Sequence, residues 1–531
     1  MKKNVIGMLA VVSMSALTLS ACGGGDSEKK ASSGSGNELT AVVVKHSLTK
    51  KNKDMEWLTK LEKDLDVKIK WEEVSADWDQ KKSPMLASGD VPDLIIGHNI
   101  VADTEFAKFP GLFADFNDYM DKLPNVQKMF EEKPQTEAIS TQLDGKILGL
   151  PKYQRFWPIS ASRQYINQEW LDNVGMEAPT TWDELYAVLL AFKEQDANGN
   201  GDANDEIPMD WSPVGTGGFG YFQPMQLLAS TGIVPSGGGN QGYFAEDGVV
   251  KSFFTDERYK ETIEFLNKCW KAGLINSKAF SQDYSAYQST GRGDGDDAKV
   301  GFTWGWEASD RFGTKIADQY TSLAPLAQKA GMTPTWSYEW DLNYAPNCVV
   351  MSANTKNKDK ALEFINALYD PEIGLQELFG SIGPNIEKDG DKYTILPPAD
   401  ENVDPGTWKW TSTWADNSPK YIADSLDVTL GKDMQDVQEQ DKALHPYVDD
   451  IVPEKSVIPV GMMKFEDADA TTLSNNNTTI LNEAMTKFAK WITEGGIEED
   501  WDAYVKTLNS AGLEENCKIV QKGFNQFYGL D

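Results

Sequence analysis

An alternation of strand and helix patterns near the start of the folded chain constrains the fold more than any other sequence feature. Residues 40–44 form an apolar, β-branched run typical of a buried strand, and residues 67–71 alternate apolar and polar side chains. Between them, apolar residues recur at helical spacing from Met55 to Leu65. A further buried strand is predicted at residues 93–97. This alternation predicts an α/β fold in which helices cover a parallel or mixed sheet.

Further patterns extend this organisation along the chain. A strand is predicted at residues 146–153, and Thr181 with Glu184 forms a capping box that begins a helix reaching about residue 195. Another helix is predicted at residues 358–369, and most of residues 479–531 should be helical. A chain of 531 residues has room for two or three domains.

The first 22 residues have the form of an export signal. A short basic head precedes an apolar stretch from Val5 to Leu19, which is shorter than the about 20 residues that a membrane span needs. The ending Leu-Ser-Ala-Cys resembles a bacterial lipobox, in which Cys22 would be lipidated and become the mature N-terminus. The Gly/Ser-rich residues that follow fit a flexible tether. The alternative is an ordinary signal peptide with an incidental cysteine.

The charge balance excludes one class of partner. The chain has 50 Lys and Arg against 82 Asp and Glu, a net charge of −32. Nucleic-acid-binding proteins use positive fields to displace the counterions of phosphates, so we expect no nucleic acid as a partner. We interpret the acidity as a solubility property of an exported protein.

Sequence motifs of catalysis are sparse. The chain has three histidines and no HExxH, GxSxG or GxxxxGK[ST] string. With so many carboxylates, an acidic pair for glycoside hydrolysis stays open, and Glu307 and Asp341, which lie beside aromatic residues, are the first to consider. A surface-anchored carbohydrate-active enzyme, such as a glycoside hydrolase or polysaccharide lyase, is therefore one function that the sequence leaves open, as the alternative to a non-catalytic binding protein.

An Asp/Asn/Gly-rich segment after the helix predicted from Thr181 resembles a calcium-binding loop. Oxygen-bearing side chains alternate along it, glycines allow a tight turn, and Ca²⁺ takes about six to eight oxygen ligands. The twelfth position of the EF-hand pattern is Ile207 instead of Glu, so the loop is not an EF-hand proper. A metal-free surface turn is the alternative, but the regular alternation favours a structural calcium ion. The candidate ligands are Asp196, Asn198, Asn200, Asp202, Asp205 and Glu206.

Aromatic residues at two-residue spacing suggest a ligand surface. These sets are Trp304 with Trp306, Trp336 with Tyr338 and Trp340, and Trp408 with Trp410. In an extended chain such residues share a face, and flat aromatic faces suit the C–H surfaces of sugar rings. For any single pair a core stripe is the alternative. The set as a whole favours a sugar-binding groove.

Taken together, these features resemble an extracellular solute-binding lipoprotein of an ABC importer. The resemblance is to the family-1 sugar-binding group, which includes LipO-like lipoproteins and alginate-oligosaccharide-binding proteins. It is carried by residues 86–93, 144–151, 165–171 and 179–185, with the calcium-like loop and residues 491–502. In relatives the corresponding loop binds calcium. An extra residue between Asp202 and Asp205 leaves its closing ligands open.

The resemblance implies a two-lobe, periplasmic-binding-protein-like α/β fold of type II, with mixed sheets flanked by helices, a hinge between the lobes and extra C-terminal helices. It places the crossings between lobes near residues 151–153, 324–325 and 370–371. The expected parts are a signal peptide at 1–21, a lipidated tether at 22–38, lobe 1 at 39–151 with 325–370, and lobe 2 at 152–324 with 371–531.

The expected function is that of a non-catalytic receptor. It would capture an oligosaccharide between its lobes and deliver it to the transmembrane permease subunits of an ABC importer, with hinge closure as the signal. We expect a monomer at the extracellular face of the cell membrane, held there only by its lipid. A receptor for a peptide or a lipid-like ligand is a further alternative.

Candidate ligand contacts follow from chemistry and position, because open α/β sheets bind ligands at the carboxyl ends of their strands. From the first lobe and the first crossing they are His46, Trp78, His98, Asn99, Arg155 and Trp157. From the second lobe they are Trp211, Trp304, Trp306, Glu307 and Trp340.

Overall fold

The structure is a computed structural model that describes residues 37–47, 49–202, 204–215, 217–236, 241–339, 342–400, 403 and 405–530. The expected signal peptide, the lipidation site at Cys22 and most of the tether lie outside the described residues, as do Trp340 and Asp341. Among the helices of this described part, none has both the length and the apolar character needed to cross a bilayer.

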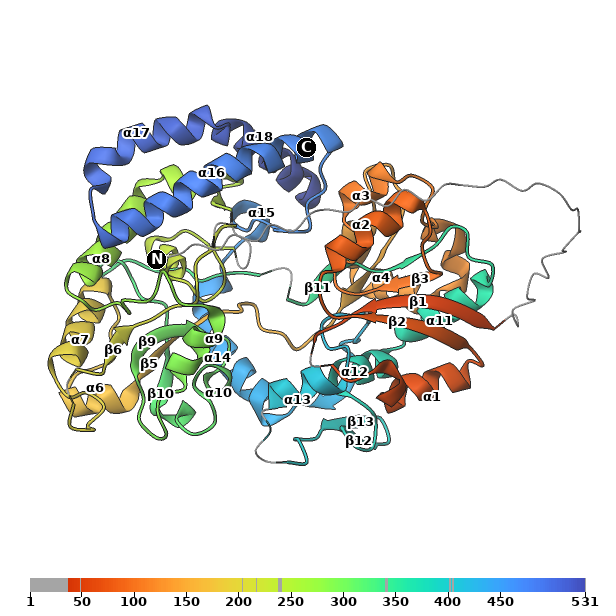
Figure 1. The fold of residues 1–531 in the computed structure, drawn as a ribbon, viewed down its shortest axis with the longest axis horizontal. Coiled ribbons are helices and arrows are strands. Elements are labelled where there is room, and N and C mark those ends of the chain that lie inside the picture. The colour runs from red at the N-terminus through yellow and green to blue at the C-terminus, as the bar shows by residue number, and fades with distance from the viewer. Residues whose placement is uncertain are drawn as a thin grey trace, which may run out of the picture. The chain divides into compact units, whose positions relative to one another are not determined.

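The first lobe is built on a mixed sheet with the strand order β2-β1-β3-β11-β4 (Figure 1). Its described strands are β1 (Glu38–Val44), β2 (Lys68–Val74), β3 (Leu94–Ile96), β4 (Leu150–Tyr153) and β11 (Tyr344–Met351). β1 pairs in parallel with β2 and β3, whereas β11 is antiparallel to β3 and β4. Its helices are α1 (Glu56–Asp64), α2 (Trp78–Ser88), α3 (Asp103–Lys108), α4 (Pro124–Glu132), α5 (Pro134–Ser140) and α11 (Lys358–Leu368), with 3₁₀ turns at Asn52–Asp54 and Phe116–Lys122.

The second lobe is built on a sheet with the strand order β10-β5-β9-β6. Its strands are β5 (Arg163–Asn167), β6 (Ile207–Met209), β9 (Val300–Gly305) and β10 (Tyr320–Leu323), and a separate hairpin joins β7 (Tyr243–Glu246) to β8 (Val249–Ser252). Its first helices are α6 (Gln168–Val174), α7 (Trp182–Glu194), α8 (Glu257–Lys271), α9 (Tyr284–Gly291) and α10 (Ala308–Phe312), with 3₁₀ turns at Pro224–Thr231, Phe253–Thr255 and Ala317–Gln319.

The last third of the chain adds a small layer and long helices. The small layer holds α12 (Pro371–Phe379), β12 (Ile386–Asp389), β13 (Lys392–Ile395), α13 (Pro405–Ser412) and β14 (Asp427–Thr429). The helices that follow are α14 (Lys432–Val448), α15 (Pro453–Ser456), α16 (Asp467–Thr493), α17 (Ile497–Ser510) and α18 (Leu513–Tyr528). Figure 1 shows α16, α17 and α18 together beside α8, and α16 contacts α8 directly.

These elements confirm the predicted α/β pattern. Each predicted strand and helix has its counterpart, and α7 begins as predicted, with the Thr181 hydroxyl accepting from the Glu184 backbone N–H at 3.3 Å. In α11 the predicted apolar face, Ala361, Phe364, Ile365 and Leu368, is buried. Apolar periodicity predicted the elements that pack one face on a core, such as α7 and α11, and continuous apolar runs predicted β1 and β3, which are buried on both faces.

The two large cores divide the chain at other points than we expected. Leu326 and Trp336 pack in the second lobe's core, where the Trp336 indole donates to the Ser162 carbonyl at 2.9 Å. The chain joins the first sheet only at β11, so it returns later than residues 324–325. Trp414 and Tyr421 belong to the first lobe's core, which places the last crossing after them and not at residues 370–371. Both expected boundaries are therefore corrected.

Trp414 should be a stabilising residue of the first lobe although it lies far along the chain. Its ring contacts Trp57 edge-on at 5.1 Å, and its indole donates to the Asn52 side chain at 3.0 Å. Replacing this buried ring by the smaller Trp414→Leu should lower the free energy of unfolding by about 3 kcal/mol in urea denaturation. Trp408→Leu, at a half-buried position of α13, is the control. A loss below about 1 kcal/mol for Trp414→Leu would contradict this assignment.

Candidate functional site

Residues predicted to bind a ligand gather at one edge of the first sheet. β1, β2 and β3 are parallel, and β4 runs the same way because both β3 and β4 are antiparallel to β11. Their carboxyl ends therefore share an edge. His46, Trp78 and the pair His98–Asn99 follow β1, β2 and β3 there, as expected. The Trp78 indole donates to a main-chain carbonyl at Ile100 (3.0 Å), so its polar end is already bonded.

The second sheet presents a corresponding edge. β6 and β9 are parallel, and β9 ends at Gly305 directly opposite Arg163, where β5 begins. Trp306 follows β9 at this edge. The buried Arg163 guanidinium donates to the Trp306 carbonyl at 3.0 Å and lies 5.5 Å from its ring centroid. The start of β5, reached by the first crossing, thus holds Trp306 in place.

Main-chain hydrogen bonds join three segments that lie where the chain passes between the lobes or next to such a passage. We name residues 152–157, 342–345 and 415–422 the crossing segments. The Gln154 N–H donates to the Asn343 carbonyl at 2.9 Å, the Tyr153 N–H to the Lys420 carbonyl at 2.8 Å, and the Ile422 N–H to the Tyr153 carbonyl at 3.0 Å. Segments far apart in the sequence therefore lie side by side.

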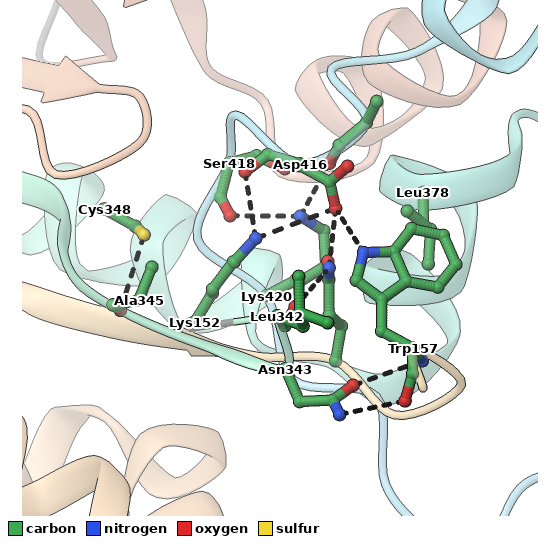
Figure 2. Close-up of polar contacts among 12 residues, drawn as sticks. Lys152, Trp157, Leu342, Asn343, Ala345, Cys348, Leu378, Asp416, Ser418 and Lys420 are labelled. Atoms are coloured by element: carbon green, nitrogen blue, oxygen red, sulfur yellow. Dashed lines mark hydrogen bonds and ion pairs between the residues drawn. The ribbon is translucent and has the colours of Figure 1, made fainter. Parts of the chain in front are cut away.

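Asp416 lies at the centre of polar contacts among the crossing segments (Figure 2). Its Oδ1 accepts from Gln154 Nε2 at 2.6 Å and from Trp157 Nε1 at 3.2 Å. The Lys152 ammonium lies 3.7 Å from the same oxygen and donates to the Asp416 carbonyl at 3.3 Å. One carboxylate oxygen thus joins the third crossing segment to side chains of the first.

The charges around Asp416 compensate one another. Burial alone would raise the pKa of Asp416, but Lys152, Lys409 and Lys420 lower it to about 2. Burial and the nearby Lys152 lower the pKa of Lys420 to about 8, and its Nζ donates to two main-chain carbonyls. Burial raises the pKa of Glu377, which is fully enclosed beside this cluster, to about 8. Asp416 is consequently ionised at neutral pH.

Trp157 and Trp306, both predicted contacts, are brought together by the fold. Their ring centroids lie 6.1 Å apart at 70°, and both side chains are half-buried. The Asn343 side chain accepts from the Trp157 N–H at 3.2 Å and donates to its carbonyl at 3.1 Å. Lys409 of α13 lies 4.4 Å from the Trp157 ring centroid. Trp157 therefore sits where the first crossing, the second lobe and α13 meet.

His98 has an exposed side chain with Lys152 and Asp416 as charged neighbours. Surrounding protein lowers the pKa of its imidazole to about 4, and the positive charge of Lys152 adds to this shift. The imidazole is neutral at neutral pH, so it offers one hydrogen-bond donor and one acceptor.

Two predicted contacts lie in the core instead. Trp211 and Trp304 are fully buried in the second lobe. The Trp304 ring packs against the Phe302 ring, with 4.9 Å between their centroids. β9 ends at Gly305, so Trp306 lies past the end of the strand. The expected shared face of Trp304 and Trp306 is wrong because the extended chain stops between them. Their complete burial removes Trp211 and Trp304 from the candidate site.

The expectation of an extended chain at Trp408 and Trp410 is also wrong. Both lie in α13, a helix that begins at Pro405. Successive residues of an α-helix turn by about 100°, so residues two apart point to nearly opposite sides. Proline at the first helical position favours a helix start, and this signal outweighs the aromatic spacing.

Glu307 and Arg155 are engaged with the protein itself. Glu307 caps α10, where its carboxylate accepts from the backbone N–H groups of Ser309 (2.9 Å) and Asp310 (3.0 Å). The Arg155 guanidinium donates to the Asp424 carbonyl at 2.6 Å. Both side chains therefore fix local structure. Asp341, the carboxylate considered with Glu307, lies outside the described residues.

Four residues of the candidate site were missed by the sequence motifs. They are Gln154, Asn343, Lys409 and Asp416. Each is an ordinary polar residue outside any motif, and the crossing segments bring them together only through the fold. The one available signal was the run Trp-Ala-Asp-Asn at residues 414–417, an aromatic residue beside polar ones.

The predicted calcium loop connects α7 to β6 and is organised by its own side chains. The Asp205 carboxylate accepts from the Asn198 and Asn200 amides at 3.0 and 2.9 Å. Asp196 Oδ2 accepts from the Gly201 N–H at 2.9 Å, and Glu206 Oε1 from the Ala197 N–H at 2.9 Å. The loop therefore curls so that its oxygen-bearing side chains face one another.

Two oxygens of this loop fit a bound cation. Asp196 Oδ1 and Glu206 Oε2 are buried without a hydrogen-bond partner, and burial raises the pKa of Glu206. In the described residues no group of three acidic, His or Cys side chains stands ready for a metal, so amide oxygens would have to complete the site. Asp202 instead accepts from the Asn204 N–H at 3.2 Å.

Comparisons with known proteins agree with this architecture. Residues 45–374 match the family model for bacterial extracellular solute-binding proteins. The chain is 28% identical over 488 residues to the fructooligosaccharide ABC transporter substrate-binding protein FusA of Streptococcus pneumoniae, a match that covers 88% of this chain and 86% of FusA.

Solved structures are similar along nearly the whole chain. An HMO-binding solute-binding protein associated with an ABC transporter of Bifidobacterium longum infantis has a TM-score of 0.85 and 36% identity, over 92% of this chain and 99% of that one. An EF-hand mutant of FusA in complex with fructo-nystose has a TM-score of 0.80 and 26% identity, over 93% and 100% of the two chains. The expected two-lobe fold is confirmed, and the chain belongs to the bacterial extracellular solute-binding proteins.

Proposed function

We propose that this chain is the extracellular substrate-binding lipoprotein of an ABC importer, which captures an oligosaccharide between its lobes and delivers it to the permease. The observation that carries the proposal is the half-buried pair Trp157–Trp306. Trp157 follows the end of β4 in the first sheet, and Trp306 follows the end of β9 in the second. The similarity to FusA, described as a fructooligosaccharide-binding protein, supports this ligand class.

The chemistry around this pair suits a sugar. Indole faces cover the C–H surface of a pyranose or furanose ring, and neutral polar groups bond its hydroxyls. His98 offers a neutral imidazole at the same sheet edge. Of the sequence-predicted contacts we retain His46, Trp78, His98, Asn99, Trp157 and Trp306. Trp340 remains a proposal from sequence alone.

A receptor is favoured over a carbohydrate-active enzyme because Glu307, the first candidate for a catalytic carboxylate, is bonded to the backbone N–H groups at the start of α10. Calorimetry with fructooligosaccharides and other neutral glycans, followed by an assay for new reducing ends, separates the two functions. Binding without turnover supports the receptor, and turnover supports the enzyme. Binding of peptides in place of glycans would refute the ligand class.

We further propose that the protein acts as a monomer and that lipidation of Cys22 is its sole attachment to the membrane. The lipobox-like ending before Cys22 and the glycine-rich residues after it support this location at the extracellular face.

Removing the Trp157 indole should weaken oligosaccharide binding. Loss of a central tryptophan from a binding surface costs about 2 kcal/mol or more, so Trp157→Ala should lower the affinity at least about thirtyfold in titration calorimetry. Trp270→Ala, at a half-buried position on α8 away from the crossing segments, is the control and should bind as the wild type does. Equal affinities for Trp157→Ala and the wild type would contradict this site.

Calcium should stabilise the protein through Asp196 and Glu206. Calcium at about 100 times its dissociation constant adds about 2.7 kcal/mol to the free energy of unfolding, which should raise the Tm of EDTA-treated protein by about 3 °C. Asp196→Asn and Glu206→Gln should abolish most of this rise, whereas Asp183→Asn, on the exposed face of α7, should preserve it. A Tm that is independent of calcium would refute the proposed ion.

Oligosaccharide affinity should be insensitive to His98 ionisation down to pH 5. Because the pKa of His98 is lowered to about 4, its imidazole stays neutral above that pH and takes up a proton only as the pH falls through 4. Protonation removes its acceptor nitrogen, so affinity should fall there. His98→Gln should show a smaller fall over the same range. A change in affinity centred near pH 6.5 that is lost in His98→Gln would contradict the lowered pKa.

A further inference from the structure

We propose that Asp416 is a positioning residue of the ligand site, whose carboxylate holds the Trp157 indole in the orientation that binds the ligand. This inference rests on the proposed function. Asp416 itself need not touch the ligand. It acts through Trp157, which it joins to the third crossing segment.

Asp416 of the third crossing segment is bonded to two side chains of the first. Its Oδ1 accepts from the Trp157 indole at 3.2 Å and from Gln154 Nε2 at 2.6 Å. The same Gln154 nitrogen lies 3.2 Å from the Leu342 carbonyl, to which it also donates. Gln154 is fully buried, so it cannot turn to water for other partners. All three crossing segments are therefore joined through one amide and one carboxylate.

The main chain directly before Trp157 is strained and is held by several contacts. Phe156, directly before it, has φ +92°, which is unfavourable for a bulky residue. Such strain persists only where neighbouring contacts fix it. On one side Arg155 donates to the Asp424 carbonyl at 2.6 Å, and on the other Asn343 pairs with both main-chain groups of Trp157. The indole itself contacts the Trp306 ring and Lys409, and the Asp416 bond is the hydrogen bond that orients its N–H.

A second strained residue supports the same role from the third crossing segment. Ala415 has φ +47° and is fully buried directly before Asp416. Its N–H donates to the Thr413 hydroxyl at 2.9 Å, and its carbonyl accepts from Lys420 Nζ at 2.8 Å. The main chain that carries the Asp416 carboxylate is therefore held as firmly as the chain that carries Trp157.

The positive charges nearby make an ionised acceptor necessary. Lys152 lies 3.7 Å from Asp416 Oδ1, and Lys409 lies 4.4 Å from the Trp157 ring centroid. A charged acceptor forms a stronger hydrogen bond to an indole N–H than a neutral amide does. Asn at this position would keep an acceptor oxygen and the shape of the side chain, but it would leave the lysines uncompensated.

The test is a double-mutant cycle measured by titration calorimetry with an oligosaccharide that the wild type binds. Asp416→Asn should lower the affinity about tenfold, the scale of one charge-assisted hydrogen bond. In a Trp157→Phe background, which keeps an aromatic face without the N–H, the same change should lower affinity less than about threefold. A general loss of stability would instead weaken both backgrounds equally, which would overturn the proposal.

Asp500→Asn is the matched control. Asp500 also accepts from a tryptophan indole, Trp491 Nε1 at 3.4 Å, and from a lysine, Lys487 at 2.7 Å, but on α16 and α17. It should change the Tm without changing the affinity. If Asp416→Asn does not fold, Trp157→Phe alone carries the test and should weaken binding several-fold.

The outcomes separate this inference from the function on which it rests. Wild-type affinity in both Asp416→Asn and Trp157→Phe refutes the positioning role and leaves the proposed function intact. A wild-type protein that binds no oligosaccharide refutes the proposed function and this inference with it.

Discussion

The two lobes depend on hydrogen bonds among three chain segments that are distant in sequence. Tyr153 is bonded through its N–H and its carbonyl to Lys420 and Ile422, and Gln154 is bonded to Asn343. These main-chain bonds extend the edge of the first sheet to the place where the chain enters the second lobe. The positions of Trp157 and Asp416, which lie on these segments, follow from this pairing.

The same pairing buries several charged side chains. Lysines and carboxylates lie close together there, so their opposite charges compensate one another. Lys420 and Glu377 are fully buried, and burial shifts the pKa of each toward its neutral form. Breaking a buried ion pair leaves a lone charge and typically costs about 3–5 kcal/mol. Removing one member of the cluster around Asp416 should therefore be costly, although the desolvation of its members leaves the cluster as a whole with little net stabilisation.

The sequence predicted those parts of the fold that local periodicity determines. β2, α7 and α11 bury one face and were found from their apolar spacing, whereas β1 and β3 are buried on both faces and were found from their continuous apolar runs. The same reasoning failed where an element ends between two residues, as at Trp304 and Trp306, or where a helix begins, as before Trp408. Asp416 and Gln154 could not be found at all, because their significance lies in contacts between residues about 260 positions apart in the chain.

The charged side chains predicted as ligand contacts, Arg155 and Glu307, are bonded to the protein itself, which suits a neutral ligand. The Arg155 guanidinium donates to main-chain carbonyls, and the Arg163 guanidinium donates to the Trp306 carbonyl. The Glu307 carboxylate caps α10. His98 is neutral at neutral pH. A net charge of −32 adds a general repulsion of anions. The groups proposed to face a ligand are then mainly aromatic surface and neutral hydrogen bonders, a combination that favours hydroxyl-bearing rings, while the Lys409 ammonium, 4.4 Å from the Trp157 ring centroid, adds a positive charge beside them.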